Sequence, residues 1–261
     1  MKNLSATMQP SGATPIFSSE FKFKMMKKLM ERRLMGILMI AGLLTFGQLA
    51  FGQSREKRDV SNFSALSVSS AFKVEISVGS TESLEIEAED RYMDDIITEV
   101  RGGTLVIRIR DSRDTKRMRD SPKAYLTVKS LDRINASGAV VLNTRDALKG
   151  KKLDLEISGA TVINLEMEVE ELYLESSGAC VISLEGIAKE QVVKTSGATT
   201  YRAYDLESVN ADIRVSGAGS ANVYVTGKLD VHASGASSIR YRGGASVNAD
   251  TSGASSVRKG E

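Results

Sequence analysis

Tyrosine and arginine side chains recur late in the sequence at intervals that could place them on one face of a regular fold. Tyr204, Tyr224 and Arg242 follow one another at nearly equal spacing. Tyrosine rings can stack on sugar rings, and arginine pairs with carboxylates or donates to hydroxyls. The sequence therefore predicts a binding face for an anionic or glycan partner, built by Arg202, Tyr204, Tyr224, Arg240 and Arg242. The alternative is that these tyrosines only cover strand edges, where β-surfaces favour them.

Two aspartates at a similar interval offer a different chemistry. Asp230 follows Asp212 at this spacing, and His232 comes soon after the second of them. If the fold stacks successive repeats as adjacent rungs of β-strand, the two aspartates would lie about 5 Å apart. This is near the carboxylate separation of a retaining glycosidase. A polysaccharide-active hydrolase or lyase is therefore the alternative function. Arg214 is close to the pair in sequence, which also fits two exposed carboxylates that contribute only solubility.

Other residue types that build reactive sites are scarce. The chain has one Cys, one His and no Trp, so no internal disulfide can form. Cys180 directly follows a Ser-Gly-Ala tripeptide, where other copies of the tripeptide are followed by Val, Thr, Gly or Ser. We interpret it as a packing residue. No dense carboxylate loop of the kind that binds Ca²⁺ is present in the sequence, so we expect no metal site. We also expect no catalytic residue and no cofactor.

The tripeptide Ser-Gly-Ala sets the positions of all these residues. Seven copies follow one another at nearly constant spacing, and they begin at Ser137, Ser158, Ser177, Ser196, Ser216, Ser234 and Ser252. With its Ser as position 1, alternate residues before it and at positions 6 and 8 are mostly apolar. Position 6 is occupied by Leu142, Ile163, Ile182, Tyr201, Ala221, Ile239 and Val257. This alternation indicates two short strands per repeat, each with one buried face.

Repeats of this length must stack in order to bury their apolar faces. They predict an all-β fold, a parallel and right-handed β-helix-like β-solenoid with rungs of roughly 18–21 residues. Glycine permits positive φ at each corner, and we expect Ala to point inward there and Ser to bond to the turn backbone. The expected corner glycines are Gly138, Gly159, Gly178, Gly197, Gly217, Gly235 and Gly253.

Residues 55–136 are less regular and predict a β cap ahead of the Ser-Gly-Ala rungs at 137–258. A short helix is expected at 91–97, and the segment from Ser70 to Ile76 looks like a degenerate rung start. The charged segment from Asp111 to Ser121 is typical of an exposed loop. Strand-like runs occur at 64–69, 72–78, 83–89, 104–110 and 123–129.

An apolar segment ending at Phe51 predicts export. It follows a basic stretch and ends in small residues, which is the layout of a cleaved signal peptide. A retained N-terminal anchor is the alternative. We therefore expect residues 1–52 to be a signal region, with 1–24 as an upstream start misread as coding. Residues 53–261 would then be one exported domain without a transmembrane span.

The charge of the predicted domain differs from that of the whole chain. The chain has 35 basic and 33 acidic residues, and residues 1–52 contain seven of the basic and two of the acidic ones. The remainder therefore has a net charge of −3, which is not the electrostatic footprint of a nucleic-acid-binding protein.

The start of the predicted domain resembles a bacterial family. The segments Arg58–Phe63 and Leu66–Val74 are similar to the opening of the family named "putative auto-transporter adhesin, head GIN domain". The segments Glu87–Asp90 and Gly103–Ile107, together with the recurring tripeptide, extend the resemblance over 55–258. The resemblance implies an exported, adhesin-like protein and assigns no catalytic residue.

These features predict an exported, non-catalytic β-solenoid that acts as an adhesin-like binding scaffold at the cell surface or in the periplasm. Its expected partner is a glycan or another cell-envelope component. The polysaccharide-active enzyme is the first alternative, and a structural cell-envelope protein is the second. A concave cleft at Asp212 and Asp230 would favour the enzyme, whereas a flat Tyr/Arg face would favour binding.

Overall fold

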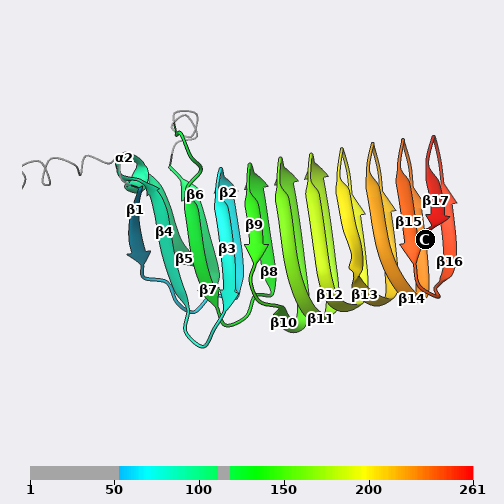
Figure 1. Ribbon diagram of the computed structural model, residues 1–261, viewed down its shortest axis with the longest axis horizontal. Helices are drawn as coiled ribbons and strands as arrows, with labels where there is room; N and C mark the ends of the chain where they lie inside the picture. The colour runs from blue at the N-terminus through cyan, green and yellow to red at the C-terminus, as the bar shows by residue number, and fades with distance from the viewer. Residues whose placement is uncertain (1–52, 111–117, 261) are drawn as a thin grey trace, which may run out of the picture. The chain divides into compact units, whose positions relative to one another are not determined.

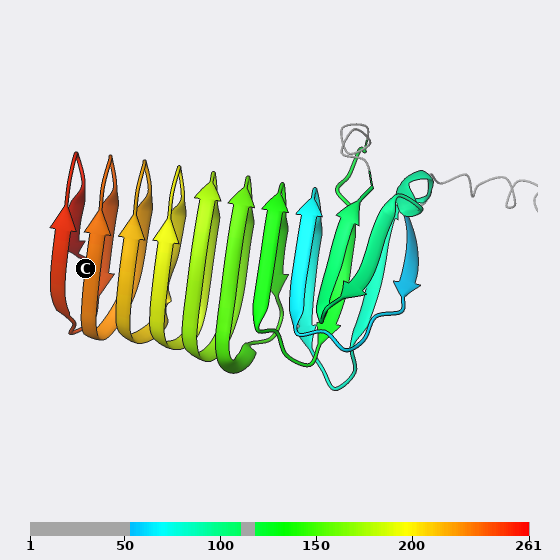
Figure 2. The ribbon, with the colours of Figure 1, turned by 180° about the vertical axis from the view of Figure 1, so that it is seen from behind.

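Rungs of β-strand stack side by side through most of the structure (Figures 1 and 2). The computed structural model describes residues 53–110 and 118–260. The predicted signal region at 1–52 lies outside the described residues, as do residues 111–117 of the predicted loop. Within the described ranges, one short helix, α2 (Asp90–Met93), accompanies a 17-stranded sheet. No helix in these ranges has the length and hydropathy that crossing a bilayer would require.

The strands fall into short ones in the N-terminal half, long ones from β10 to β14, and short ones again at the C-terminal end. They are β1 (Gln53–Arg58), β2 (Ala65–Ser70), β3 (Lys73–Val78), β4 (Ser83–Glu89), β5 (Ile96–Arg101), β6 (Thr104–Ile109), β7 (Lys123–Val128), β8 (Arg133–Gly138), β9 (Val141–Thr144), β10 (Leu148–Gly159), β11 (Val162–Gly178), β12 (Val181–Thr195), β13 (Thr200–Val215), β14 (Ser220–Ala233), β15 (Ser238–Arg242), β16 (Ser246–Thr251) and β17 (Ser256–Lys259).

The long strands pair with one another in parallel. β10 pairs with β11, β11 with β12, β12 with β13, and β13 with β14. In the first of these pairs Ser158 lies opposite Ser177 and Gly159 opposite Gly178, so that the tripeptides of successive rungs align. Each tripeptide makes a tight corner between one strand and the next. The predicted parallel β-solenoid is confirmed, with about seven turns.

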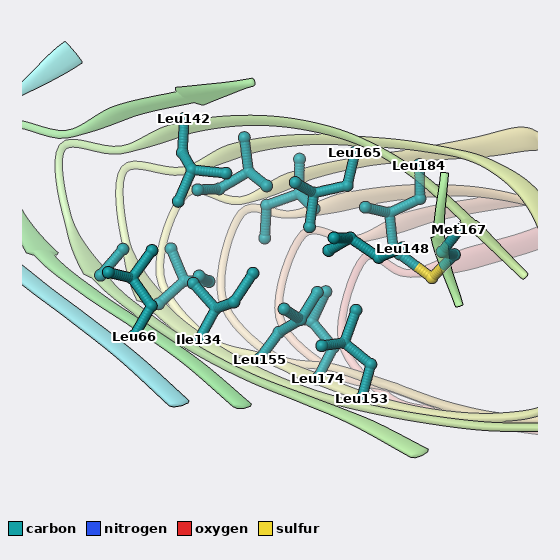
Figure 3. Close-up of a cluster of buried hydrophobic side chains, with 14 of the residues drawn as sticks. Leu66, Ile134, Leu142, Leu148, Leu153, Leu155, Leu165, Met167, Leu174 and Leu184 are labelled. Atoms are coloured by element: carbon teal, nitrogen blue, oxygen red, sulfur yellow. The ribbon is translucent and has the colours of Figure 1, made fainter. Parts of the chain in front are cut away.

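The apolar columns predicted from the repeat form the core. Ile163, Ile182 and Ile239, all at position 6, are each 0% exposed. At the last rung the equivalent Val257 is only half-buried, because no further rung of the described residues covers it. Figure 3 shows two facing rows of core side chains, Leu142, Leu165 and Leu184 in one row and Leu66, Ile134, Leu155 and Leu174 in the other.

At each tight corner the residues of the tripeptide face outward. All seven corner glycines have positive φ, from 70° at Gly253 to 103° at Gly178. The alanine of the tripeptide is exposed, as at Ala160 and Ala179, so the prediction that it points inward is wrong. The alternation of the strand continues through the corner, since Ile157, Thr161 and Ile163 are all buried and lie an even number of residues apart. The next inward side chain is therefore the residue after the alanine.

That residue fills a small buried slot and closes the corner. Thr161 Oγ1 donates a hydrogen bond of 2.8 Å to the carbonyl of Ser158, three residues earlier. Cys180 makes the equivalent contact, from Sγ to the carbonyl of Ser177 at 3.4 Å. The thiol is 1% exposed, and burial raises its pKa, which leaves it unreactive. These contacts support the interpretation of Cys180 as a packing residue.

The N-terminal region contains both regular rungs and a cap. β2 and β3 form a rung whose corner is Ser70, with a φ of 81°, opposite Gly138 of a neighbouring rung. β2 pairs in parallel with both β6 and β8, so this rung lies between strands that follow it in the chain (Figure 1). β1, β4 and β5 pair antiparallel with their neighbours. The predicted cap region at 55–136 thus holds these antiparallel strands together with strands that pair in parallel, namely β2, β3, β6, β7 and β8.

The helix expected at 91–97 is shorter than predicted. It ends at Met93, and β5 begins at Ile96. The β-branched residues at 96–98 favour a strand. Gly102 and Gly103, with φ values of 54° and 76°, then turn the chain into β6.

Candidate binding site

A bulge in β13 interrupts the stack on the face that carries the predicted Tyr/Arg residues. Against β12 the register shifts by one residue after Arg202, and against β14 it breaks between Ala203 and Glu207. Residues 204–206 therefore have no register partner on β14, whereas Asp205 and Leu206 pair again with β12. Bulges re-aim side chains and are common beside functional sites.

The bulge borders a hollow of about 430 Å³ on the outer face of β11–β14. Its lining is formed by Asn164, Leu165, Ser183, Leu184, Glu185, Arg202, Tyr204, Asp205 and Asn222. Side-chain amides, carboxylates and a guanidinium provide both donors and acceptors of hydrogen bonds. The hollow therefore suits a ligand with many hydroxyl groups.

One polar atom of the lining lacks a partner. Asn222 Oδ1 is buried and accepts no hydrogen bond from the described residues. Buried polar atoms are hydrogen-bonded in the great majority of cases, to protein or to ordered water. Because Asn222 lines the hollow, a hydroxyl or N–H group that enters the hollow is a suitable donor for this oxygen.

Tyr204 packs beneath Arg242. The guanidinium carbon of Arg242 is 4.1 Å from the centroid of the Tyr204 ring, which is a cation–π contact. A side chain at Gly260 would meet the Tyr204 hydroxyl within 2.6 Å, so the C-terminal segment also packs against this residue. These contacts fix the ring where it lines the hollow.

The structure does not gather the five predicted binding residues at one point. Arg202 and Tyr204 line the hollow, and Arg242 packs on Tyr204. Tyr224 lies in register with Arg242 rather than with Tyr204, because the bulge removes Tyr204 from the ladder. The two tyrosines lie on adjacent rungs, β13 and β14, but they are not register partners. Arg240 lies in the same column as Arg202 and Asn222 but does not line the hollow.

Sequence reasoning missed Asn222, Glu185 and Asp205 as part of the same site, although the repeat spacing held a signal for it. The interval from Ser196 to Ser216 is longer than both the interval before it and the interval after it. A rung that is longer than its neighbours must bulge where its strands pair with theirs.

A buried hydrogen-bond network underlies this face. Tyr201 is 0% exposed and occupies the position that Ala221 takes on the next rung. Its hydroxyl donates to Gln191 Oε1 at 2.9 Å, and Gln191 Nε2 donates to Ser208 Oγ at 2.7 Å. Burial raises the pKa of Tyr201, so its hydroxyl stays protonated and remains a donor. The network ties β12 to β13 next to the bulge.

The residues of the alternative acidic site, Asp212 and Asp230, lie side by side, but each forms an ion pair. Asp212 and Asp230 are register partners on β13 and β14. Each is paired with a cation of its own strand: Arg214 Nη2 is 2.8 Å from Asp212 Oδ2, and Lys228 Nζ is 2.6 Å from Asp230 Oδ2. His232 belongs to the neighbouring outward column, in register with Arg214.

The electrostatics of this pair do not suit general acid catalysis. The hydrogen bond from Lys228 lowers the pKa of Asp230, whereas the acid of a glycosidase needs a raised pKa. Neither Asp212 nor Asp230 lines the hollow at β13. Among the described residues, no three His, Cys, Asp or Glu side chains gather in a way that could hold a metal ion. The geometry thus favours exposed ion pairs over the hydrolase or lyase.

Solved structures share this fold at low sequence identity. One, described as a "putative adhesin" from Bacteroides fragilis, is 20% identical with a TM-score of 0.74, over 80% of this chain and 97% of that one. A "putative adhesin" from Parabacteroides merdae is 18% identical with a TM-score of 0.64, over 81% and 98%. A "putative lipid binding protein" from Parabacteroides distasonis is 19% identical with a TM-score of 0.63, over 81% and 98%. No curated protein matches the chain.

The family is shown by the sequence itself. Residues 62–245 match the family described as "Putative auto-transporter adhesin, head GIN domain". The matched segment runs from just before β2 to just before β16 and so includes regular rungs, antiparallel cap strands and the bulge. The chain therefore belongs to this head GIN domain family.

Proposed function

We propose that the protein is an adhesin-like, non-catalytic scaffold outside the cytoplasm that holds a glycan of the cell envelope in the hollow at β13. The observation that carries the proposal is the bulge at residues 204–206, which places Tyr204 beside Arg202 and the unpartnered Asn222 Oδ1. An aromatic ring, a guanidinium and an amide are the groups that bind sugar rings and their hydroxyls. The family description as an adhesin supports a binding role.

The rigid setting of the site supports the same proposal. Tyr204 is fixed by Arg242, and Arg202 is held on a strand that pairs on both sides. A preorganised site loses little conformational entropy when it binds. The interior of the described rungs is filled by side chains, so a lipid would also have to bind at the surface.

The proposal is tested with purified protein on a glycan array and on isolated cell envelopes. Tyr204→Ser should weaken glycan binding and envelope retention about tenfold, which is about 1.4 kcal/mol. Tyr224→Ser is the matched control, since Tyr224 is a partly exposed tyrosine that does not line the hollow, and it should bind as the wild type does. Equal retention of wild type and Tyr204→Ser would overturn the site.

A second variant separates binding from folding. Asn222→Ala removes the buried oxygen that lacks a partner, so the melting temperature should stay unchanged or rise while glycan binding falls. If envelope retention falls only in variants that also melt earlier, the structural cell-envelope role is favoured. Binding of vesicles but of no glycan would replace the glycan with a lipid.

A further inference from the structure

A separate surface groove lies along the strand segments just before the tight corners. The hollow at β13 lies instead along the strand segments just after the corners. The groove has a volume of about 380 Å³ and crosses the rungs from β11 to β16. Its acidic and basic side chains are Glu175, Lys194, Arg214, His232 and Asp250, which lie in register in one column. Serines of successive tripeptides also line it.

The basic groups of this column lie at its centre and the acidic ones at its two ends. Lys194 Nζ donates to Tyr173 Oη at 2.6 Å, and no carboxylate of the described residues lies within 4.0 Å of it. Arg214 is the register partner of Lys194 and binds Asp212 through Nε and Nη2, with 52% of its side chain exposed. An anionic group between Lys194 and Arg214 would therefore accept charge-assisted hydrogen bonds, whereas anionic groups at the ends would be repelled.

The serines supply acceptors along the groove. Ser196 Oγ donates to the carbonyl of Ser176 at 3.4 Å, and Ser216 Oγ donates to the carbonyl of Thr195 at 3.3 Å. Their protons are directed to the backbone, so the hydroxyl oxygens remain to accept hydrogen bonds from a ligand. Rungs are about 4.8 Å apart. This spacing is close to the length of one sugar unit in an extended chain.

We propose that this groove binds an extended acidic oligosaccharide along the solenoid axis. One carboxylate-bearing sugar lies between Lys194 and Arg214, and neutral sugars lie on either side of it. The sugar hydroxyls donate to the serine ladder, and the sugar carboxylate accepts from the two basic side chains. Repulsion by Glu175 and Asp250 selects against chains with a carboxylate on every sugar. The proposal does not depend on the hollow at β13.

The probe is a tetrasaccharide of alternating glucuronate and N-acetylglucosamine, and its dissociation constant is measured by calorimetry with the full chain. Replacing both basic residues, Lys194→Gln with Arg214→Gln, should weaken binding about tenfold. The matched control, Lys149→Gln with Lys189→Gln, removes two positive charges from exposed lysines that do not line the groove, and should bind as the wild type does. Thermal melting checks that both variants fold.

A variant that keeps every charge tests the hydroxyl ladder. Ser216→Ala with Ser234→Ala should weaken the tetrasaccharide several-fold and leave the weak binding of inorganic phosphate unchanged. Tyr204→Ser should not change either affinity, which separates this groove from the hollow at β13. Neutral N-acetylglucosamine tetramers and all-acidic galacturonate tetramers should both bind more weakly than the alternating probe.

Four results would overturn the proposal. The first is that the wild type does not bind the alternating tetrasaccharide, and the second is that the two double glutamine variants weaken binding equally. The third is equal affinity of the wild type for the alternating and all-acidic probes. The fourth is an unchanged affinity of the double serine variant for the alternating tetrasaccharide. Retention of the wild type on phosphatidylglycerol vesicles, without tetrasaccharide binding, would replace the sugar acid with a lipid phosphate.

Discussion

At the tight corners, each glycine is constrained by the backbone of the rung beside it. Gly178 has a φ of 103°, and a Cβ at this position would lie 2.5 Å from the carbonyl oxygen of Gly159. The same oxygen accepts a hydrogen bond of 2.8 Å from the N–H of Ala179, which joins the two rungs. A side chain at Gly178 would therefore strain its own backbone and push the rungs apart.

Gly178→Ala should destabilise the protein by about 1–3 kcal/mol, the usual cost of a strained backbone conformation. The measurement is urea unfolding followed by circular dichroism. Gly150→Ala is the control, because a Cβ there meets its nearest heavy atom at 3.8 Å and no positive φ is required. Its effect should stay within about 0.5 kcal/mol. Equal effects of the two substitutions would contradict the stacked-corner geometry.

The corner glycines and the inward columns could be predicted from the sequence, because a period of two and a recurring glycine each have one structural explanation. The period of two also decides the residues after the glycine. Run on from Ile157, it places Thr161 and Ile163 on the inner face and Ala160 outside, as the structure has them. The prediction of an inward alanine therefore conflicted with the alternation itself.

Among the elements, the cap strands depend on one nearly buried carboxylate. Glu87 on β4 is 7% exposed and accepts hydrogen bonds from Lys123 Nζ at 2.7 Å, Arg55 Nε at 2.7 Å and the Tyr125 hydroxyl at 3.1 Å. These partners lie on β7 and β1, which pair with β4 on either side. The hydrogen bonds from Lys123, then Arg55 and Tyr125, lower the pKa of Glu87 below its ordinary value.

This lowered pKa predicts acid sensitivity of the cap. The charged form of Glu87 is favoured in the folded state, so its stabilisation is present above the unfolded pKa of about 4.3 and is lost as the pH falls through the folded value. The urea midpoint of the wild type should therefore fall more steeply from pH 5 to pH 3 than that of Glu87→Gln. Glu168→Gln, at an exposed residue paired with Lys149, should keep the wild-type slope. Identical slopes for all three proteins would refute the role of Glu87.

The pairing of strands explains why the candidate site could be predicted only in part. Arg202 and Tyr204 were identified from their outward column, since outward positions are free to carry binding residues. The hollow itself depends on a register shift between rungs of different length, and a column alignment hides such a shift by assuming equal rungs. Asn222 is the register partner of Arg202 in the equal-rung alignment as well, whereas the pairing of Asp205 with Glu185 depends on the shift.

For the whole stack, the two ends differ in how they are closed. At the N-terminal end, antiparallel strands and α2 cover the stack, and Tyr92 and Met93 are buried at 8% and 6% exposure. At the other end, β16 pairs only with β14 among the described residues, and Val247 is half-buried. In a solenoid each rung is stabilised chiefly by its neighbours, so a rung with one neighbour opens most easily.

Hydrogen exchange should therefore form a gradient along the stack. Amides of β11–β13, which have rungs on both sides, should exchange slowest, and those of β16 and β17 fastest, with β1 between them. Mass spectrometry of the full chain after timed deuterium labelling measures the exchange rate of each segment. Repeating the measurement at several protein concentrations detects association between molecules. Protection of β16 equal to that of β12 at every concentration would contradict the gradient.

The groove before the tight corners reaches Asp250 on β16, so the alternating tetrasaccharide should slow hydrogen exchange in β16. A ligand confined to the hollow at β13 should leave exchange in β16 unchanged.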